Sequence, residues 1–159
     1  MTTTLRATLA AVLLCAFTAC GKKDDHAGHD HSAHKHVHTA PHGGTLVEVG
    51  EHAYNIELLR DAATGKLTAW VLDGHAENFI RIKAPALELV ATVAGAKQTL
   101  SLAAVANPAT NEKVGDTSQF EATADWLKTT TTFDGVFPTL VIRESTFSAI
   151  KFNFPKGSD

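Results

Sequence analysis

The sequence predicts an all-β protein, an antiparallel β-sandwich of the immunoglobulin-like kind, preceded by a disordered histidine-rich tail. Three features of the chain after residue 43 support this fold class. Short segments alternate apolar and polar residues, Gly, Pro, Asn and Asp stand between them, and no sustained 3.6-residue apolar period appears. We therefore expect one domain over residues 43–159, long enough to bury a hydrophobic core.

The expected strands follow one another at short intervals. Thr45–Val49 and Ala53–Leu58 alternate on either side of a turn at Gly50, and Arg60–Gly65 forms the next connection. Further strands are expected at Lys66–Leu72, Phe79–Ile82, Ala86–Val93, Gln98–Ala103, Ser118–Thr123, Val136–Arg143 and Phe147–Phe154. The alanine-rich stretch around Gly95 is interpreted as a hairpin, and only Asp125–Lys128 has the composition of a helical turn.

The first residues have the layout of a secretory signal peptide. Arg6 precedes an apolar run, Ala7–Ala19, which is too short to span a bilayer comfortably. The stretch Phe17–Gly21 resembles the lipobox of bacterial lipoproteins, although Phe17 replaces the usual leucine. That resemblance implies removal of residues 1–19 and acylation of Cys20. An ordinary signal peptide and an uncleaved anchor are the alternatives.

Loss of the signal peptide would leave no cysteine thiol for a disulfide, a metal site or catalysis, because Cys15 is removed with it and Cys20 carries lipid. The formal net charge of −3 becomes one unit more negative without Arg6. This balance argues against a nucleic-acid partner, which requires a basic surface. We expect a protein of the bacterial cell envelope, facing the periplasm or another extracytoplasmic space, whose membrane partner is reached through the lipid anchor.

The linker over residues 20–42 holds most of the imidazoles of the chain. Seven of the nine histidines lie in it: His26, His29, His31, His34, His36, His38 and His42. Neutral imidazole suits Zn(II), Cu(II) and Ni(II), and histidines at alternate positions fall on one side of an extended chain. The tail therefore predicts binding of a transition-metal ion with moderate affinity and weak selectivity. The alternative is a solvated spacer between lipid and domain.

The two remaining histidines predict a second possible metal site. If Arg60–Gly65 joins a hairpin, His52 comes close to Gly74 and His75, with Asp73 and Glu77 in the same loops. By the same reasoning, the turn at Gly50 places His42 near Leu59 and Arg60, at the opposite end. His42 would then not share an ion with His52 and His75 unless the first strand pairs elsewhere. The alternative is that both histidines are ordinary polar loop residues.

One segment resembles a known group of proteins. PHGGTLVEVGEHAYNIELL, followed by GKLTAWVLDGHAEN, spans residues 41–78. It is similar to a segment that recurs in small bacterial envelope proteins and in the leading parts of some heavy-metal efflux adaptor proteins. The resemblance implies a role in metal handling, with His42, His52 and His75 as the matching histidines.

These observations predict a lipid-anchored envelope protein that captures, buffers or hands over Zn, Cu or Ni, with a metal efflux or uptake system as a possible partner. A structural envelope lipoprotein with the tail as spacer is the first alternative. A metal-dependent hydrolase using His52, His75, Asp73 and Glu77 is the second. The sequence has no nucleophile elbow, no H-E-x-x-H motif and no phosphate loop, so we do not expect an enzyme.

Overall fold

The computed structural model describes residues 38–158. The expected signal peptide, the proposed lipidation site Cys20 and the tail histidines His26, His29, His31, His34 and His36 lie outside this range. Within it there are eight strands: β1 (Thr45–Val49), β2 (Tyr54–Asp61), β3 (Lys66–Asp73), β4 (Ala86–Val93), β5 (Ala96–Ala104), β6 (Gln119–Thr123), β7 (Phe133–Ile142) and β8 (Ser145–Phe154). The same residues contain one short α-helix, α1 (Trp126–Thr129), and one 3-10 turn, η1 (Pro108–Thr110).

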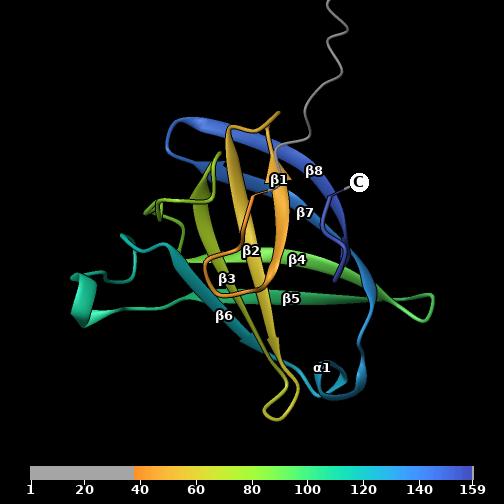
Figure 1. Cartoon of the computed structure of the whole chain (residues 1–159). Coiled ribbons are helices and arrows are strands. Elements are labelled where there is room, and N and C mark those ends of the chain that lie inside the picture. Colours follow the sequence, from red (N-terminus) through yellow and green to blue (C-terminus); the bar gives the residue numbers. More distant parts are fainter. Residues whose placement is uncertain (1–37, 159) are drawn as a thin grey trace, which may run out of the picture. The chain divides into compact units, whose positions relative to one another are not determined.

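All eight strands belong to one antiparallel sheet, in the order β1-β2-β3-β6-β5-β4-β7-β8. The sheet curls so that β1 and β8, at its two ends, lie next to each other (Figure 1). The prediction of an antiparallel all-β domain is confirmed. The two packed sheets of an immunoglobulin-like sandwich are not, because the pairing is continuous and gives a nearly closed, barrel-like sheet.

Local turn chemistry explains why neighbouring strands pair as they do. Val93 pairs with Ala96, so the β4–β5 hairpin has a two-residue loop, in which Ala94 and Gly95 have φ of 48° and 84°. Two positive φ values suit the right-handed twist of the flanking strands, and glycine adopts them without steric cost. The hairpin expected at Gly95 is therefore confirmed.

The segment Phe79–Ile82 is not a strand, which corrects the prediction. Phe79 makes an isolated bridge to Leu72, at the end of β3, whereas Ile82 bridges to Thr117, in the loop before β6. Because the segment changes partner within three residues, no single neighbour offers it a continuous ladder. Its alternating sequence is explained by burial of Ile80 and Ile82 in the core.

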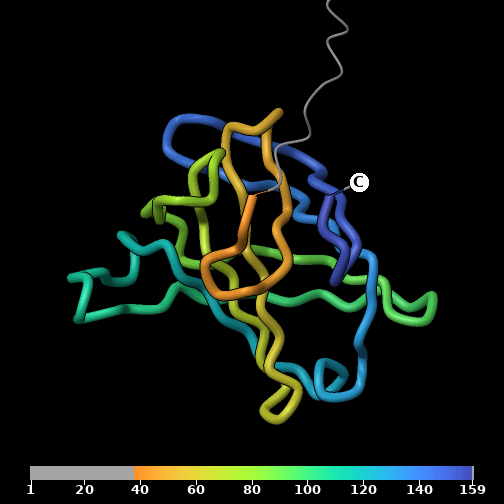
Figure 2. The backbone as a smooth tube through the Cα atoms, viewed as in Figure 1, coloured from red at the N-terminus to blue at the C-terminus, as the bar shows by residue number. Residues whose placement is uncertain are grey.

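The core lies inside the curled sheet and is filled by one face of each strand. Alternate residues of β1, namely Thr45, Val47 and Val49, are buried. In both strands of the β7–β8 hairpin, the residues that face the core change from one alternating set to the other. The change occurs near Pro138 in β7 and near Ala149 in β8, and Ala149 has a φ of 54°. The register is the same on both sides of this point, so the hairpin bends as a unit (Figure 2).

Candidate metal-binding histidines

His42 lies at a tight turn that returns the chain onto the sheet. The Gly43 N–H donates to the Ala40 carbonyl at 3.0 Å, and Gly43 has a φ of 72°. A Cβ on Gly44 would lie 2.6 Å from the Leu58 carbonyl oxygen, so only glycine fits there. The Gly-Gly pair thus permits both the turn and the close approach to β2.

A buried carboxylate holds this turn. Glu57, on β2, is fully buried. Its Oε1 accepts hydrogen bonds from the backbone N–H of His42 at 2.8 Å and of Gly44 at 2.9 Å, and its Oε2 lies 2.8 Å from His42 Nδ1. Burial of a carboxylate is costly unless its lone pairs are satisfied, and three donors satisfy them here. Glu57 therefore fixes both the backbone and the ring of His42.

The His42 ring also rests on an aromatic surface. It stacks on Trp70, which pairs with Glu57 across β2 and β3, with ring centroids 3.9 Å apart and planes inclined by 18°. Phe79 lies 5.7 Å away on another side. With Nδ1 donating to Glu57, a neutral His42 ring carries its free lone pair on Nε2. A carboxylate behind one ring nitrogen is the arrangement that metal-binding histidines commonly use.

These three aromatic rings line a pocket of about 450 Å³, which a second buried carboxylate, that of Glu112, also lines. Glu112 accepts hydrogen bonds from Ser118 Oγ at 2.7 Å and Thr110 Oγ1 at 2.9 Å, and Arg81 Nε lies 3.6 Å from it. Burial raises the pKa of Glu112, but these hydrogen bonds and the Arg81 charge outweigh it, so its pKa is lowered. The pocket wall is thus fixed by internal bonds.

His38 and His75 form the one close pair of histidine rings within residues 38–158. Their ring centroids are 5.6 Å apart, in an edge-to-face arrangement. A metal–nitrogen bond of about 2.0–2.1 Å puts a ring centroid roughly 3.2 Å from the ion, so two imidazoles on a tetrahedral ion have centroids about 5.2 Å apart. The observed separation of 5.6 Å is close to this value.

His52 lies near Gly74, as expected, but its ring is used elsewhere. A Cβ on Gly74 would collide with the His52 carbonyl oxygen, so the two backbones touch. The His52 ring faces Glu48 instead, with Nδ1 3.2 Å from Glu48 Oε2. The expected proximity of the two loops is correct, whereas His52 and His75 do not share a site.

Asp73 is engaged in its own turn. Its Oδ2 accepts from the Asn78 side chain at 2.6 Å and its Oδ1 from the Glu77 N–H at 2.9 Å. The Asn78 bond lowers the pKa of Asp73, burial opposes this, and the Glu77 N–H lowers it further. In residues 38–158 no three His, Cys, Asp or Glu side chains converge as a metal site would require. The set of His52, His75, Asp73 and Glu77 is therefore not assembled here.

The sequence did not predict a role for two residues of this site, Glu57 and Trp70. Glu57 lies between Ile56 and Leu58, both of which face the core, so strand alternation places it on the outer face of β2. It is buried only because the turn at His42 covers that face. Trp70 pairs with Glu57 across β2 and β3 and supports the His42 ring. The available signal was a carboxylate placed directly between the apolar residues Ile56 and Leu58 of β2.

Comparison of the chain with protein-family models, with curated proteins and with solved structures finds no match. Among the described residues, no helix has the length and apolar character that crossing a bilayer requires.

Proposed function

We propose that this protein captures transition-metal ions at the bacterial cell envelope, using histidines of its N-terminal tail together with His75 of the β-domain. The observation that carries the proposal is the pair of rings of His38 and His75, 5.6 Å apart. His38 is the last histidine of the alternating series His34, His36, His38, and His75 belongs to the folded domain. An ion between them would join the tail to the domain.

Two imidazoles alone bind a divalent ion weakly, and further ligands are needed. The tail supplies candidates in His26, His29, His31, His34 and His36. Exposed Glu77, two residues after His75, offers a carboxylate. Several ligand sets of similar stability would compete, so we propose Zn(II), Cu(II) or Ni(II) as cargo with modest selectivity between them.

His42 has a different role in this proposal. Glu57 and Trp70 hold it in place, so it secures the base of the tail four residues after His38. The ring is 37% exposed, which leaves Nε2 room for a ligand of its own. Without a second imidazole converging on it in the described residues, we assign it to positioning.

The proposed location follows from the first residues of the chain. Acylation of Cys20 would tether the protein to a membrane, and residues 20–37 would span at most about 60 Å when extended. The bound ion would then be buffered near the membrane or passed to an efflux or uptake system. Such a partner is proposed from the resemblance of residues 41–78 alone.

The test uses the chain from residue 20 to 159, with Cys20→Ser so that no lipid is attached. Calorimetric titration with Zn(II), Cu(II) and Ni(II) should show binding that weakens at least tenfold in His75→Ala. The matched control is His52→Ala, which removes an exposed histidine in the adjacent loop and should leave affinity unchanged. Electron spin-echo spectroscopy of the Cu(II) complex should count one imidazole fewer in His75→Ala.

Three other results would decide against the proposal in different ways. Equal affinity in both variants would place the ion in the tail alone. A larger loss in His52→Ala would move the site to the β1–β2 turn. No binding to the parent chain would favour the reading of the tail as a spacer in a structural lipoprotein. We do not propose a hydrolase, because its four candidate residues do not converge in the described domain.

A further inference from the structure

The curled sheet does not close completely, and a gap remains between its two end strands. At one end the gap is closed by the Phe147 ring, which packs against Gly50 so tightly that a Cβ there would collide with it. At the other end the turn after β8 fills it, with Glu48 N donating to Ser158 Oγ at 2.8 Å and Thr45 Oγ1 to the Pro155 carbonyl at 3.1 Å. We call the opening between these closures the seam window: residues 48–51 on one side and 149–153 on the other.

Backbone groups of β8 face the seam window without partners. Asn153 exchanges two backbone hydrogen bonds with Gly157, of 2.9 and 2.7 Å, so its N–H and C=O point away from β7. Because backbone groups alternate in direction along a strand, every second residue of β8 counted from Asn153 also directs its N–H and C=O toward the seam. Lys151, two residues earlier, therefore directs its N–H and C=O toward the window. Neither group has a hydrogen-bond partner within residues 38–158.

The facing edge of β1 is equally incomplete. Glu48 N is satisfied by a hydroxyl of the C-terminal turn rather than by a strand carbonyl. The Glu48 carbonyl has no backbone or side-chain donor among the described residues. Unpaired backbone groups on two facing strand edges are the arrangement that strand addition uses.

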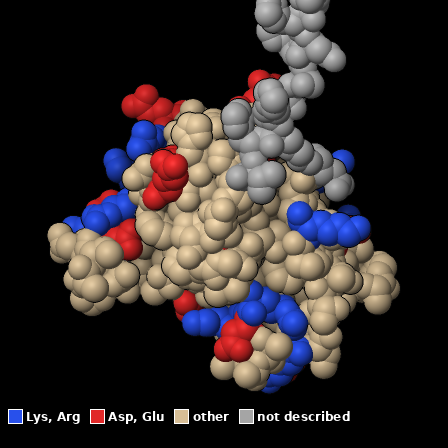
Figure 3. Space-filling view, in the orientation of Figure 1, with Lys and Arg blue, Asp and Glu red and all other residues tan. Residues whose placement is uncertain are grey.

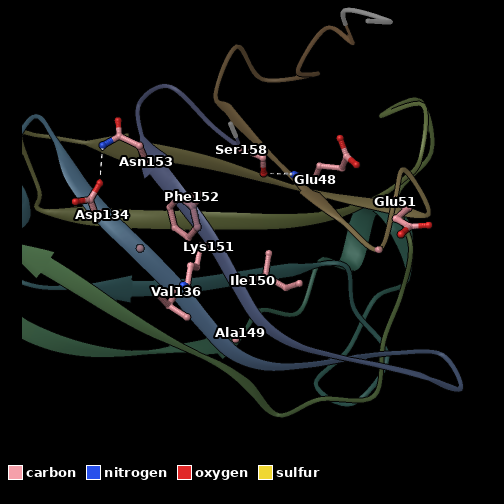
Figure 4. Close-up of a pocket in the computed structure, with 12 residues that line it drawn as sticks. Glu48, Glu51, Asp134, Val136, Ala149, Ile150, Lys151, Phe152, Asn153 and Ser158 are labelled. Atoms are coloured by element: carbon pink, nitrogen blue, oxygen red, sulfur yellow. Dashed lines mark hydrogen bonds between the residues drawn. The ribbon is translucent and has the colours of Figure 1, made fainter. Parts of the chain in front are cut away.

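The side chains of the seam window define what could enter it. A pocket of about 610 Å³ lies there. Figure 4 shows residues that line it, with Val136, Ile150 and Phe152 as its apolar part. Three carboxylates, of Glu48, Glu51 and Asp134, border it, against one basic side chain, Lys151. Figure 3 shows acidic and basic side chains interspersed over the face that it draws. The border of the pocket, in contrast, has three carboxylates and one basic side chain.

We infer that the seam window binds an extended peptide segment of a partner protein by strand addition, and that this segment carries Lys or Arg at alternate positions with small apolar residues between them. The incoming backbone would bond to the N–H and C=O of Lys151. Its basic side chains would meet the carboxylates outside, and its apolar side chains would cover Ile150 and Phe152. On the β1 side of the window, Glu48 and Val49 belong to the strand and Gly50 and Glu51 to the turn after it, so the incoming segment would pair over about two residues. This inference is independent of metal capture.

The probe is the peptide Ac-Lys-Val-Lys-Val-Lys-NH2, titrated in EDTA into the ¹⁵N-labelled chain from residue 20 to 159 with Cys20→Ser. We expect saturable amide shifts at Lys151 and its neighbours and around Glu48–Glu51. A peptide N-methylated at every residue, which cannot pair through either edge, and a peptide with Glu in place of Lys should each bind at least tenfold more weakly. Glu51→Lys should weaken binding at least fivefold, whereas Glu144→Lys, at the exposed tip of the β7–β8 hairpin, should not.

Several outcomes would overturn the inference. Absence of seam shifts at millimolar peptide, or equal binding of the N-methylated peptide, would exclude strand addition. If replacing residues 21–37 by a Gly-Ser sequence of equal length shifts the Lys151 amide without added peptide, the occupant is the chain's own tail. Shifts of the same amides that depend on protein concentration would identify a second copy.

Discussion

Replacement of Glu57 by alanine should destabilise the domain by about 3–5 kcal/mol. The carboxylate is fully buried and accepts three hydrogen bonds, from His42 N, His42 Nδ1 and Gly44 N, between 2.8 and 2.9 Å. A hydrogen bond to a charged group contributes roughly 1.5–3 kcal/mol, and the three share one acceptor group, so they do not add fully. Removing one partner of a buried charged contact typically costs about 3–5 kcal/mol.

Urea unfolding of the parent chain and of Glu57→Ala measures this loss, and the melting temperature should fall by roughly 10 °C or more. Glu88→Ala is the matched control, since it removes an exposed glutamate from a strand and should change stability by less than about 0.5 kcal/mol. His42→Ala should cost only about 1–2 kcal/mol, because the two backbone donors remain. A loss below about 1 kcal/mol in Glu57→Ala would refute the view that this carboxylate holds the turn.

Three further predictions concern other parts of the described domain. Asp73→Ala should cost about 1 kcal/mol in urea unfolding because its turn loses two hydrogen bonds, but metal affinity should be unchanged; a tenfold loss of affinity would make Asp73 a ligand. The pKa of Glu112 is lowered because hydrogen bonding outweighs burial, so its contribution to stability is present at neutral pH and is lost as pH falls below about 4.5. The stability difference between the parent and Glu112→Gln should therefore be largest near pH 7 and shrink in acid, and a difference that grows in acid would contradict the sign. Gly135→Ala should cost about 1–3 kcal/mol because its Cβ would collide with the Phe152 ring, and Phe152→Leu in the same chain should recover part of the loss.

Local sequence patterns predicted the strands well where one neighbour supports a whole strand. The bounds of β1 and β4 agree with the alternation of Thr45–Val49 and Ala86–Val93. Gly95 identified the hairpin because its turn needs positive φ. The strand predicted at Phe79–Ile82 was wrong for the complementary reason: Ile80 and Ile82 alternate because they fill the core, and the segment changes its pairing partner halfway along.

The arrangement of the sheet could not be predicted from local patterns. A sandwich and a barrel-like sheet use the same alternating strands, and they differ in which distant strands pair. Here β3 pairs with β6 across more than forty residues of chain, which joins what would otherwise be two sheets. Nothing in the sequence of Lys66–Asp73 specifies that partner.

The same limit applies to the histidines. The composition of the sequence identified the histidine-rich tail. The expected pairing of a hairpin correctly predicted that His52 lies close to Gly74. The contacts of His38 with His75 and of His42 with Glu57 arise because residues 38–42 fold back over the outer face of β2 and β3. That return of the chain depends on the turn at Gly43 and on burial of Glu57. Strand alternation alone would place the Glu57 side chain in solvent.

This return of the chain connects Glu57 to the proposed metal capture. His38 lies four residues before His42, so its ring cannot move farther than about 13 Å of extended chain from the point where Glu57 holds His42. Within that radius, the position of His38 beside His75 depends on the turn remaining intact. Glu57 therefore acts as a positioning residue in the proposed function: it touches no ion, yet it keeps one tail histidine next to the domain histidine. A tail attached at a loosely held residue would present the same imidazoles, but with greater loss of conformational entropy on binding and a lower affinity at His75.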